Sequence, residues 1–360
     1  MATTVNPINQ NTYIDLGEAL VNIQPAYGMI DNSGLFDEQG ITALTHAYKI
    51  IDQKSPKMTR LTSRTERDAM AVEREKYKWV TMGGITVKET GGVHVEDLIG
   101  VTGYNGLDFE SDTFQGEMVK ELTRLANVGV ANMEYIKLTT TQGVTRDPKD
   151  GSVAIDGFAN TGTVRSTFTI DARPTNVNIR AELQALANKV ASLNGYNGNV
   201  GTIELVLEDS DFNAIVGHPE FSTLYKLAYS GMGTALLNNP LLNGQAQQTK
   251  RTQYGFRKEF VIDNILLVTY PQKFYRWDGT EATATVRGKA WTIVHGVSSL
   301  YQVKYTPAPY VSKYAQVGQK WFARSTGIVK DTHADITLES HLIPFMSRPE
   351  MAIDVTITTA

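Results

Sequence analysis

The side chains best suited to bind a metal lie near the C-terminus. Five of them occur within eleven positions: Asp331, His333, Asp335, Glu339 and His341. If this segment is a strand, the last four would share one face, because alternate residues of a strand point the same way. The same alternation describes the solvent-facing polar side of an edge strand whose other face carries Ile336 and Leu338. We favour the second interpretation, an edge strand without a metal site.

Other patterns that carry catalysis or cofactor binding are missing. The chain has no cysteine, and its six histidines form no His-Glu-x-x-His zinc pair. It has no Gly-x-x-x-x-Gly-Lys-Ser/Thr phosphate loop and no Gly-x-Ser-x-Gly nucleophile turn, and the segment that starts at Gly231 lacks the third glycine of a dinucleotide site. The segment that starts at Asp147 departs from the calcium-loop pattern. We therefore expect no catalytic residue, no metal, no cofactor and no enzyme.

A dense mixture of both charge signs lies between Asp52 and Lys78; the charge density alone favours a solvated loop, but unstructured loops of this length are rare in compact domains. Strand-like stretches follow at Tyr77–Met82 and Ile85–Glu89, and the Gly83-Gly84 pair between them is a hairpin signal. The sequence therefore predicts a two-stranded excursion from residue 51 to residue 92. An isolated hairpin is marginally stable in water, so this one would need a surface to lie on. The alternative is a solvated charged loop.

The composition sets the broad class. The chain has 360 residues, 41% of them hydrophobic and 20% charged, and a net charge of −4, which is typical of a folded globular protein. The slight acidity argues against a dedicated nucleic-acid binder, whose affinity comes largely from Lys and Arg on phosphates. The first residues lack a secretory pattern, and no apolar run reaches the roughly 20 residues that span a bilayer. We expect a soluble chain of intracellular type.

The clearest helix is predicted at residues 112–138. Asp112 is a plausible N-cap, with Gln115 three residues later. Apolar residues follow at steps of three, four or multiples of these: Phe114, Met118, Leu122, Leu125, Met133 and Ile136. Such a helix would be about 39 Å long at 1.5 Å per residue and would suit a scaffold spine. Gly116 and Gly129 could mark a bend or a close crossing.

The remaining segments mix helix and strand without strict alternation, so the predicted class is α+β. We expect strands within 139–173, a helix at 177–193, a strand at 202–208 and a helix at 211–230, then a hairpin around Asp263-Asn264 and further strands to the end. Residues 1–50 show only a weak helical pattern, at 40–51. They are predicted to be an arm that lies along another surface, or else a frayed terminus.

The order of these segments resembles the major capsid protein of tailed phages with the HK97-type fold. The residues that sharpen the resemblance are Gln319–Ser325, Asp331–Ser340 and Leu342–Pro349. They are similar to the closing segment of the lambda-type major head protein family, in which a tryptophan precedes an Asp-Pro turn, an apolar stretch, an Arg-Pro pair and a final strand. Thr332 stands where that family often has proline, and His341 where it often has alanine.

The resemblance implies a division into named parts. These would be an N-terminal arm (1–50), an extended loop over a neighbouring subunit (51–98), a peripheral domain with the spine helix (99–178), an axial domain (179–306) and the C-terminal strands of the peripheral domain (307–360). The chain would form hexamers and pentamers of an icosahedral shell around double-stranded DNA. Its partners would be itself, a portal protein, and scaffolding and decoration proteins. It would reside in the virion, and in the host cytoplasm before assembly, without a membrane.

Three alternatives stay open: a cellular compartment shell of encapsulin type, another phage structural protein such as a tail-tube protein, and an α+β enzyme with an unrecognised site. If the shell interpretation holds, charged and aromatic residues of the loop would contact a neighbour. The candidates for contact between subunits are Lys57, Arg60, Arg64, Arg67, Arg74, Trp79, Glu117 and Glu121. We hypothesise that three of the arginines, at positions 60, 64 and 67, pair with the two spine-helix glutamates of an adjacent copy.

Overall fold

The computed structural model describes residues 14–15, 28–52, 76–94, 114–176, 178–194, 200–221, 248–252, 255–311, 313, 316–329 and 333–359. The chain divides into two compact units, and each is described by itself. Unit 1 comprises Met1–His46, Gly83–Ile136 and Val303–Pro344. Unit 2 comprises Ala47–Met82, Lys137–Gln302 and Phe345–Ala360.

Unit 1 is built on a six-stranded sheet. Its strands are β1 (Ile14–Asp15), β17 (Phe322–Val329), β18 (His333–Met346), β16 (Tyr301–Tyr305) and β2 (Asp37–Gly40) in that order, with β5 (Ile85–His94) paired to β18. The β5–β18 pair is antiparallel and in register over ten residues, from His94 opposite His333 to Ile85 opposite Leu342. The long strand β18 is therefore the centre of this sheet.

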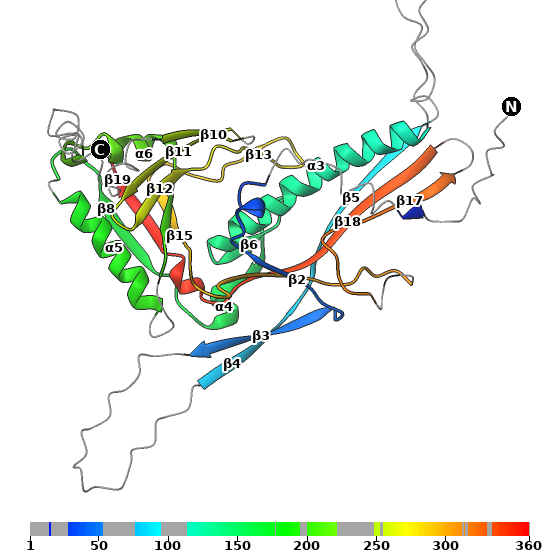
Figure 1. Cartoon of the computed structure of the whole chain (residues 1–360), viewed down its shortest axis with the longest axis horizontal. Coiled ribbons are helices and arrows are strands. Elements are labelled where there is room, and N and C mark those ends of the chain that lie inside the picture. The colour runs from blue at the N-terminus through cyan, green and yellow to red at the C-terminus, as the bar shows by residue number, and fades with distance from the viewer. Residues whose placement is uncertain are drawn as a thin grey trace, which may run out of the picture. The chain divides into compact units, whose positions relative to one another are not determined.

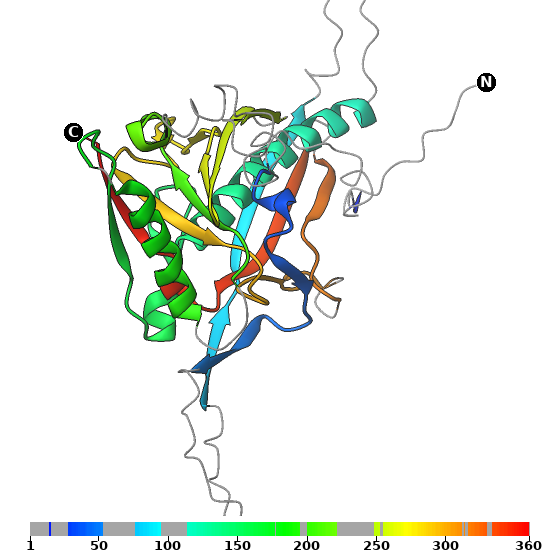
Figure 2. The same cartoon turned by 60° about the vertical axis from the view of Figure 1, so that its left-hand side comes forward.

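Helix α3 (Phe114–Thr141) lies along β5 and β18 in both views (Figure 1, Figure 2). The apolar stripe predicted from the sequence faces the sheet and forms one core with it. That core contains Met118, Leu122, Leu125 and Ala126 of the helix with Val93, Ala323, Ile336 and Leu338 of the strands. Gly129 is a close crossing, because a Cβ there would lie 2.8 Å from the Trp321 ring. Glycine lets the helix approach that tryptophan.

Unit 2 contains a seven-stranded sheet. The order is β10 (Gln248–Thr252), β11 (Gly255–Ile262), β12 (Ile265–Thr269), β9 (Ile203–Leu207), β15 (Lys289–Val294), β19 (Asp354–Thr358) and β8 (Thr167–Asp171). The β12–β9 and β19–β8 pairs are parallel and the other recorded pairs are antiparallel. Helix α5 (Ile179–Asn194) buries Ile179, Leu183, Leu186 and Val190, while α6 (Asp209–Val216) buries Phe212 and Ile215.

Several smaller elements complete the described residues. Three two-stranded sheets pair β3 (Thr45–Asp52) with β4 (Lys76–Gly83), β6 (Val144–Arg146) with β7 (Val153–Asp156), and β13 (Phe274–Tyr275) with β14 (Glu281–Ala282). Short helices are η1 (Asp31–Ser33), α4 (Gly157–Thr161) and η2 (Pro349–Met351). No helix in the described part of the chain is both long and apolar enough to cross a membrane.

The predicted hairpin at Gly83-Gly84 is wrong. Strand β4 pairs with β3, and β5 pairs with β18, so the two strands on either side of the glycines do not pair with each other. A two-residue hairpin turn needs positive φ at one or both central residues, and neither Gly83 nor Gly84 has it. Gly84 instead permits a close approach, since a Cβ there would meet Thr306 and the Leu342 carbonyl oxygen. Residues 85–92 of the predicted excursion are thus paired with a strand of their own chain.

Two other predictions near the arm and the C-terminus are also wrong. The weak helical pattern at 40–51 is in fact a strand over 45–52, and its β-branched and aromatic residues pair with β4. The segment around residue 335 is not an edge strand, because β17 and β5 pair along its two sides. The polar residues of β18 therefore lie inside the sheet.

Most helices were placed within a few residues by the sequence. The spine helix predicted at 112–138 is α3, and the helix predicted at 177–193 is α5 at Ile179–Asn194. The hairpin around Asp263-Asn264 is confirmed: β11 and β12 pair there, and Asp263 has a φ of 51°. The helix predicted at 211–230 corresponds to α6 up to Val216, and residues 222–230 lie outside the described residues.

The predicted domain bounds differ from the two units. Residues 137–178 and 345–360 were assigned to the peripheral domain, yet they belong to unit 2, together with most of the predicted axial residues 179–306. The reason is sheet topology, because β8 and β19 form one edge of the seven-stranded sheet. The names axial and peripheral refer to positions in a shell and stay a prediction.

Candidate functional site

The candidate metal ligands do not form a metal site among the described residues. No group of three or more His, Asp or Glu side chains in that part of the chain is arranged to hold an ion. His341 instead sits between two strand neighbours: its Nδ1 is 2.9 Å from Thr86 Oγ1 and its Nε2 is 3.3 Å from Glu339 Oε2. Asp331 lies outside the described residues.

Glu339 anchors a buried polar group at the centre of the unit 1 sheet. The directly opposite residue on β5 is Lys88, whose Nζ lies 2.9 Å from Glu339 Oε1. Burial raises the pKa of the Glu339 carboxyl, but the nearby Tyr310 hydroxyl and the Lys88 ammonium outweigh it and leave the pKa below its usual value. Burial also lowers the pKa of His341. Because Lys88 and Glu339 are directly opposite each other, their ion pair favours this register of β5 and β18.

One face of strand β4 is uncovered. Tyr77 and Trp79 are 56% and 58% exposed, and their rings meet edge to face with centroids 6.2 Å apart. The Lys49 ammonium of β3 lies 4.5 Å from the centre of the Tyr77 ring. Aromatic side chains of this size are enriched at protein interfaces, where their large apolar area is buried. This aromatic face, Lys49 with Tyr77 and Trp79, is the candidate contact surface of unit 2.

The other face of β4 is turned into its own chain. Val80 and Met82, one residue out of phase with the aromatic pair, are buried. Lys78 donates a hydrogen bond to the Asn160 carbonyl oxygen of unit 2 at 3.3 Å. A strand shows opposite faces at alternate residues, so one covered face leaves the other free for a partner.

Only some of the predicted contact residues lie in the described part of the chain. Trp79 lies on the aromatic face, whereas Lys57, Arg60, Arg64, Arg67 and Arg74 lie outside the described residues. Glu117 and Glu121 lie on α3 and already have cations from their own helix. Lys120 Nζ is 2.8 Å from Glu117 Oε1, and Arg124 makes two hydrogen bonds of 2.6 and 2.8 Å to Glu121. A cation from another molecule would have to share these carboxylates.

The described part of the N-terminal arm is bound to its own chain. Glu134 of α3 accepts hydrogen bonds from the Ile30 and Asp31 amides at 2.6 and 2.8 Å. Lys320 pairs with the Asp31 carboxylate at 2.6 Å. The amides at a chain turn thus bind a buried carboxylate, a charge-assisted arrangement. The turn at residues 30–31 of the predicted arm is therefore held by unit 1 of its own chain.

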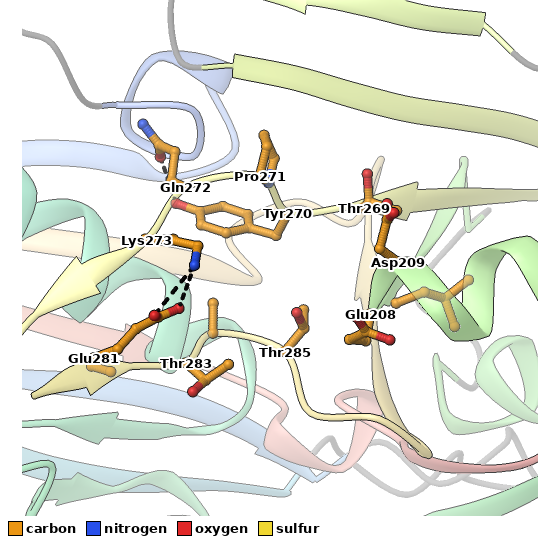
Figure 3. A pocket seen from close by; sticks show the side chains of 13 residues that line it. Glu208, Asp209, Thr269, Tyr270, Pro271, Gln272, Lys273, Glu281, Thr283 and Thr285 are labelled. Atoms are coloured by element: carbon orange, nitrogen blue, oxygen red, sulfur yellow. Dashed lines mark hydrogen bonds and ion pairs between the residues drawn. The ribbon is translucent and has the colours of Figure 1, made fainter.

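Unit 2 also holds a pocket of about 290 Å³. It is bordered by the start of α6, the end of β12 and the segment after β14. Figure 3 shows Glu208 and Asp209 at one end of the pocket and the Lys273–Glu281 ion pair, 3.2 Å long, at the other. Tyr270 and Pro271 line the part between them. Sequence reasoning missed this pocket, because its lining comes from three separate segments.

Sequence reasoning also missed two exposed aromatic residues of the β13–β14 hairpin. Tyr275 is 64% exposed and Trp277 is 86% exposed. The signal that could have found them is the Trp277-Asp278-Gly279 sequence, since Asp-Gly marks a tight turn and a tryptophan beside it has nowhere to be buried. Tyr77, which completes the aromatic face with Trp79, was likewise not singled out.

The described residues combine uncovered aromatic surfaces with an α+β scaffold. This combination suits the class of proteins that act by contact with other molecules. The phage major capsid protein E family matches residues 13–357 of the chain. The chain belongs to this family, so it is a shell-forming structural protein and a virion component. The resemblance to tailed-phage major capsid proteins is confirmed.

One solved structure supports the fold, and a second aligns over the whole chain. The crystal structure of a protein assigned as the capsid protein of a prophage of E. coli CFT073 aligns with a TM-score of 0.54 and 12% identity, covering 96% of this chain and 100% of that one. The capsid of cyanophage P-SCSP1u aligns over 100% of this chain and 92% of its own, with a TM-score of 0.46 and 10% identity. No curated protein matches in sequence. The HK97-type α+β fold expected above is confirmed.

The structure explains the C-terminal residues that carried the resemblance. Trp321 packs against the core under α3 in unit 1. In unit 2, Arg348 donates hydrogen bonds of 2.7 and 3.0 Å to the carbonyl and side-chain oxygens of Asn194, the last residue of α5. A cation at this position satisfies carbonyl groups that a helix end leaves open. Pro349 then starts the 3₁₀ turn η2.

Proposed function

We propose that copies of this chain associate through hexamers and pentamers into an icosahedral shell that encloses packaged double-stranded DNA. The observation that carries the proposal is the uncovered aromatic face of β4 in a member of a capsid family. In this proposal the role is structural and not catalytic. A portal protein, scaffolding proteins and decoration proteins are its proposed partners, and the chain resides in the host cytoplasm before it assembles.

The aromatic face supports contact with a neighbouring copy. It lies on the two-stranded β3–β4 sheet, whose other side carries the buried Val80 and Met82. The strands lead directly into residues 53–75, which carry the loop arginines. We propose that Tyr77 and Trp79 are the apolar centre of an intersubunit contact and that the loop charges form its polar rim. This division between an apolar centre and a charged rim is usual in protein interfaces.

We also keep the proposal that Arg60, Arg64 and Arg67 pair with spine-helix carboxylates of an adjacent copy. The side chains of Glu117 and Glu121 are 19% and 17% exposed, so they can be reached from solvent. Carboxylates have several acceptor positions and can bind a second guanidinium beside the first. Such pairs contribute orientation more than affinity, and salt weakens them.

The arginines can be tested by charge reversal. Replacing all three with glutamate should abolish or strongly reduce closed particles at low salt, because like charges would then face each other. A matched control carries Arg173→Glu, which changes an exposed arginine that pairs with its near neighbour Asp171. Particle yield measured by sedimentation is the readout. A wild-type yield from the triple variant would refute this pairing.

The shell itself is tested by negative-stain electron microscopy of the purified chain. Closed icosahedral particles support the proposal, and particles that form only with a scaffolding protein support it in a more specific form. Open tubes would favour a tail-tube protein. A uniform population of small oligomers under all assembly conditions would contradict a shell. Particles that enclose a cargo enzyme and no DNA would instead favour a cellular compartment of the same fold.

A further inference from the structure

Strand β8 forms one edge of the seven-stranded sheet of unit 2. The even-numbered residues in and beside β8 bond to β19, since the Ser166 carbonyl oxygen accepts from the Asp354 amide at 2.9 Å. Successive residues of a strand direct their backbone groups to opposite sides, so those of Thr167, Thr169 and Asp171 point outward. The outward groups of an edge strand are a template on which a strand of another molecule can pair.

Two side chains of helix α5 occupy this edge. Lys189 Nζ donates to the Thr167 carbonyl oxygen at 2.6 Å, and Glu182 Oε2 accepts from the Asp171 amide at 2.7 Å. Helix α5 lies beside β8 (Figure 1). Seven helical residues span about 10 Å and four strand residues about 13 Å, so side chains two turns apart on α5 can reach the two ends of β8.

Further polar contacts close the C-terminal end of the same edge. Asn176 Nδ2 donates to the Asp171 carbonyl oxygen at 2.6 Å and to Glu182 Oε1 at 3.1 Å. The Arg173 guanidinium makes two hydrogen bonds, of 2.8 and 2.6 Å, to the Asp171 carboxylate. An added strand would therefore have to displace side chains at both ends of β8.

The composition of β8 makes such protection useful. Its sequence, Thr-Phe-Thr-Ile-Asp, consists mostly of β-branched and aromatic residues, which favour strand pairing. Every copy of the chain carries the same edge, and two identical edges related by a two-fold axis can pair antiparallel, with Thr169 opposite Thr169. A protein that works at high local concentration is exposed to this kind of association.

We propose that Glu182 and Lys189 form an autoinhibitory guard, which prevents a second copy of the chain from pairing its β8 strand with this one. The two side chains do so by bonding to the backbone groups that the second strand would need. The inference goes beyond the proposed shell, because it concerns a route of association that the chain suppresses. It can therefore be tested on free subunits.

The test removes both guards at once. The Glu182→Ala/Lys189→Ala double variant loses one negative and one positive charge, so its net charge is that of the wild type. Sedimentation velocity is measured over a series of protein concentrations in a buffer in which wild-type particles do not form. The double variant should associate at a concentration at least about tenfold below that of the wild-type chain, because its edge can bond to another strand. Wild-type behaviour of the folded double variant would overturn the proposal.

A proline distinguishes edge pairing from general stickiness. Thr169→Pro removes the outward N–H at the middle of β8, a position where an edge strand tolerates proline. Added to the double variant, it should restore wild-type sedimentation, whereas association that persists would overturn the proposal. Two matched controls should sediment as the wild type does: Asn188→Ala, an exposed residue next to Lys189, and Lys273→Ala, a lysine of unit 2 that is 64% exposed.

Urea unfolding verifies that each variant folds. If the double variant does not fold, Lys189→Ala alone replaces it, since this change frees a single carbonyl group at the surface. The single variant should associate more readily than the wild-type chain and should also be reversed by Thr169→Pro, and wild-type sedimentation would overturn the guard. The outcome is separate from the proposed function: a wild-type chain that never forms particles contradicts the shell and leaves this result unchanged.

Discussion

Strands β4 and β5 follow each other with a single residue between them, yet they have opposite surroundings. Strand β5 pairs with β18 along its whole length, and Val87 and Val93 are buried. Strand β4 pairs with β3 and leaves Tyr77 and Trp79 in solvent. The boundary between the two compact units falls between Met82 and Gly83. Alternation in a sequence thus reveals that a strand has two faces, but it does not reveal whether the second face is covered by the same chain.

Side chains of α3 pack on β5, and this packing explains why β5 is buried and β4 is not. Asn132 of α3 donates to Glu89 at 2.6 Å, and Glu121 packs so closely on Gly91 that a Cβ there would overlap its carboxylate. Burial raises the pKa of Glu89, and the Asn132 hydrogen bond partly opposes that shift. Strand β5 is therefore bound to a helix and a strand of one unit. For β4 the described residues provide such cover on one face only.

The largest effect is expected at the core between α3 and β18. Leu338 is fully buried beside the Trp321 ring and Gly129. Leu338→Ala should lower the free energy of unfolding by about 2–5 kcal/mol, because it removes buried methyl groups and leaves a cavity under a rigid helix. Urea unfolding followed by tryptophan fluorescence measures this change.

The matched control for that prediction is Leu44→Ala, since Leu44 is 65% exposed. Its effect should stay within about 0.5 kcal/mol, the usual range for surface substitutions. A similar decrease in the free energy of unfolding for the two leucine variants would show that the layer under α3 is not the stable part of the molecule. The contrast drawn between β4 and β5 would then be wrong.

The sequence predicted this layer well because its signals are local. The apolar stripe of the spine helix repeats every three or four residues, so its bounds were found within three residues at each end. The partners of the strands are not local signals. That β5 pairs with a strand more than 240 residues later depends on the whole sheet, and the Gly83-Gly84 pair has the composition of a hairpin without its backbone angles.

A smaller effect is expected from acid. The pKa of buried His341 lies below that of an unfolded histidine, near 6.5, so below that pH the unfolded chain binds a proton that the folded chain does not. The free energy of unfolding should therefore decrease as the pH falls below about 6.5. Glu339, whose pKa is also lowered in the fold, should add a further decrease below its unfolded pKa, near 4.3.

His341→Gln should reduce the decrease in the free energy of unfolding between pH 7 and 5. The glutamine amide can still form a hydrogen bond with Thr86, but it does not titrate. Denaturant unfolding at a series of pH values between 7 and 5 provides the slope. His94→Gln is a suitable control, since His94 lies on the exposed side of β5. An unchanged slope for His341→Gln would mean that another group carries the acid sensitivity.

The contact residues were harder to predict than the core for a physical reason. A surface that binds another copy has no partner within its own sequence, so periodicity shows only that a face exists. Trp79 was singled out because it stands on a predicted strand beside a charged loop. Tyr77 and Trp277 have the same chemistry, but they were recognised only when their exposure was known. The pocket required the assembly of three segments and left no local trace.

The smallest effect on stability is expected for Trp79 on the aromatic face, where the proposed effect on assembly is large. Trp79→Ala should change the free energy of unfolding of the free subunit by no more than about 1 kcal/mol, since the ring is mostly in water and loses only its edge contact with Tyr77. The same substitution should suppress particle formation, because the Trp79 ring is proposed to be buried only when copies associate in the shell.

Trp291→Ala is the matched contrast. Trp291 is buried and donates a hydrogen bond to Thr141 at 3.1 Å, so its loss should destabilise the subunit by about 3–5 kcal/mol. Stability from urea unfolding and particle yield from sedimentation should therefore separate the two tryptophans. If Trp79→Ala unfolds as easily as Trp291→Ala, the aromatic face is part of the core of the subunit and not a surface for another copy.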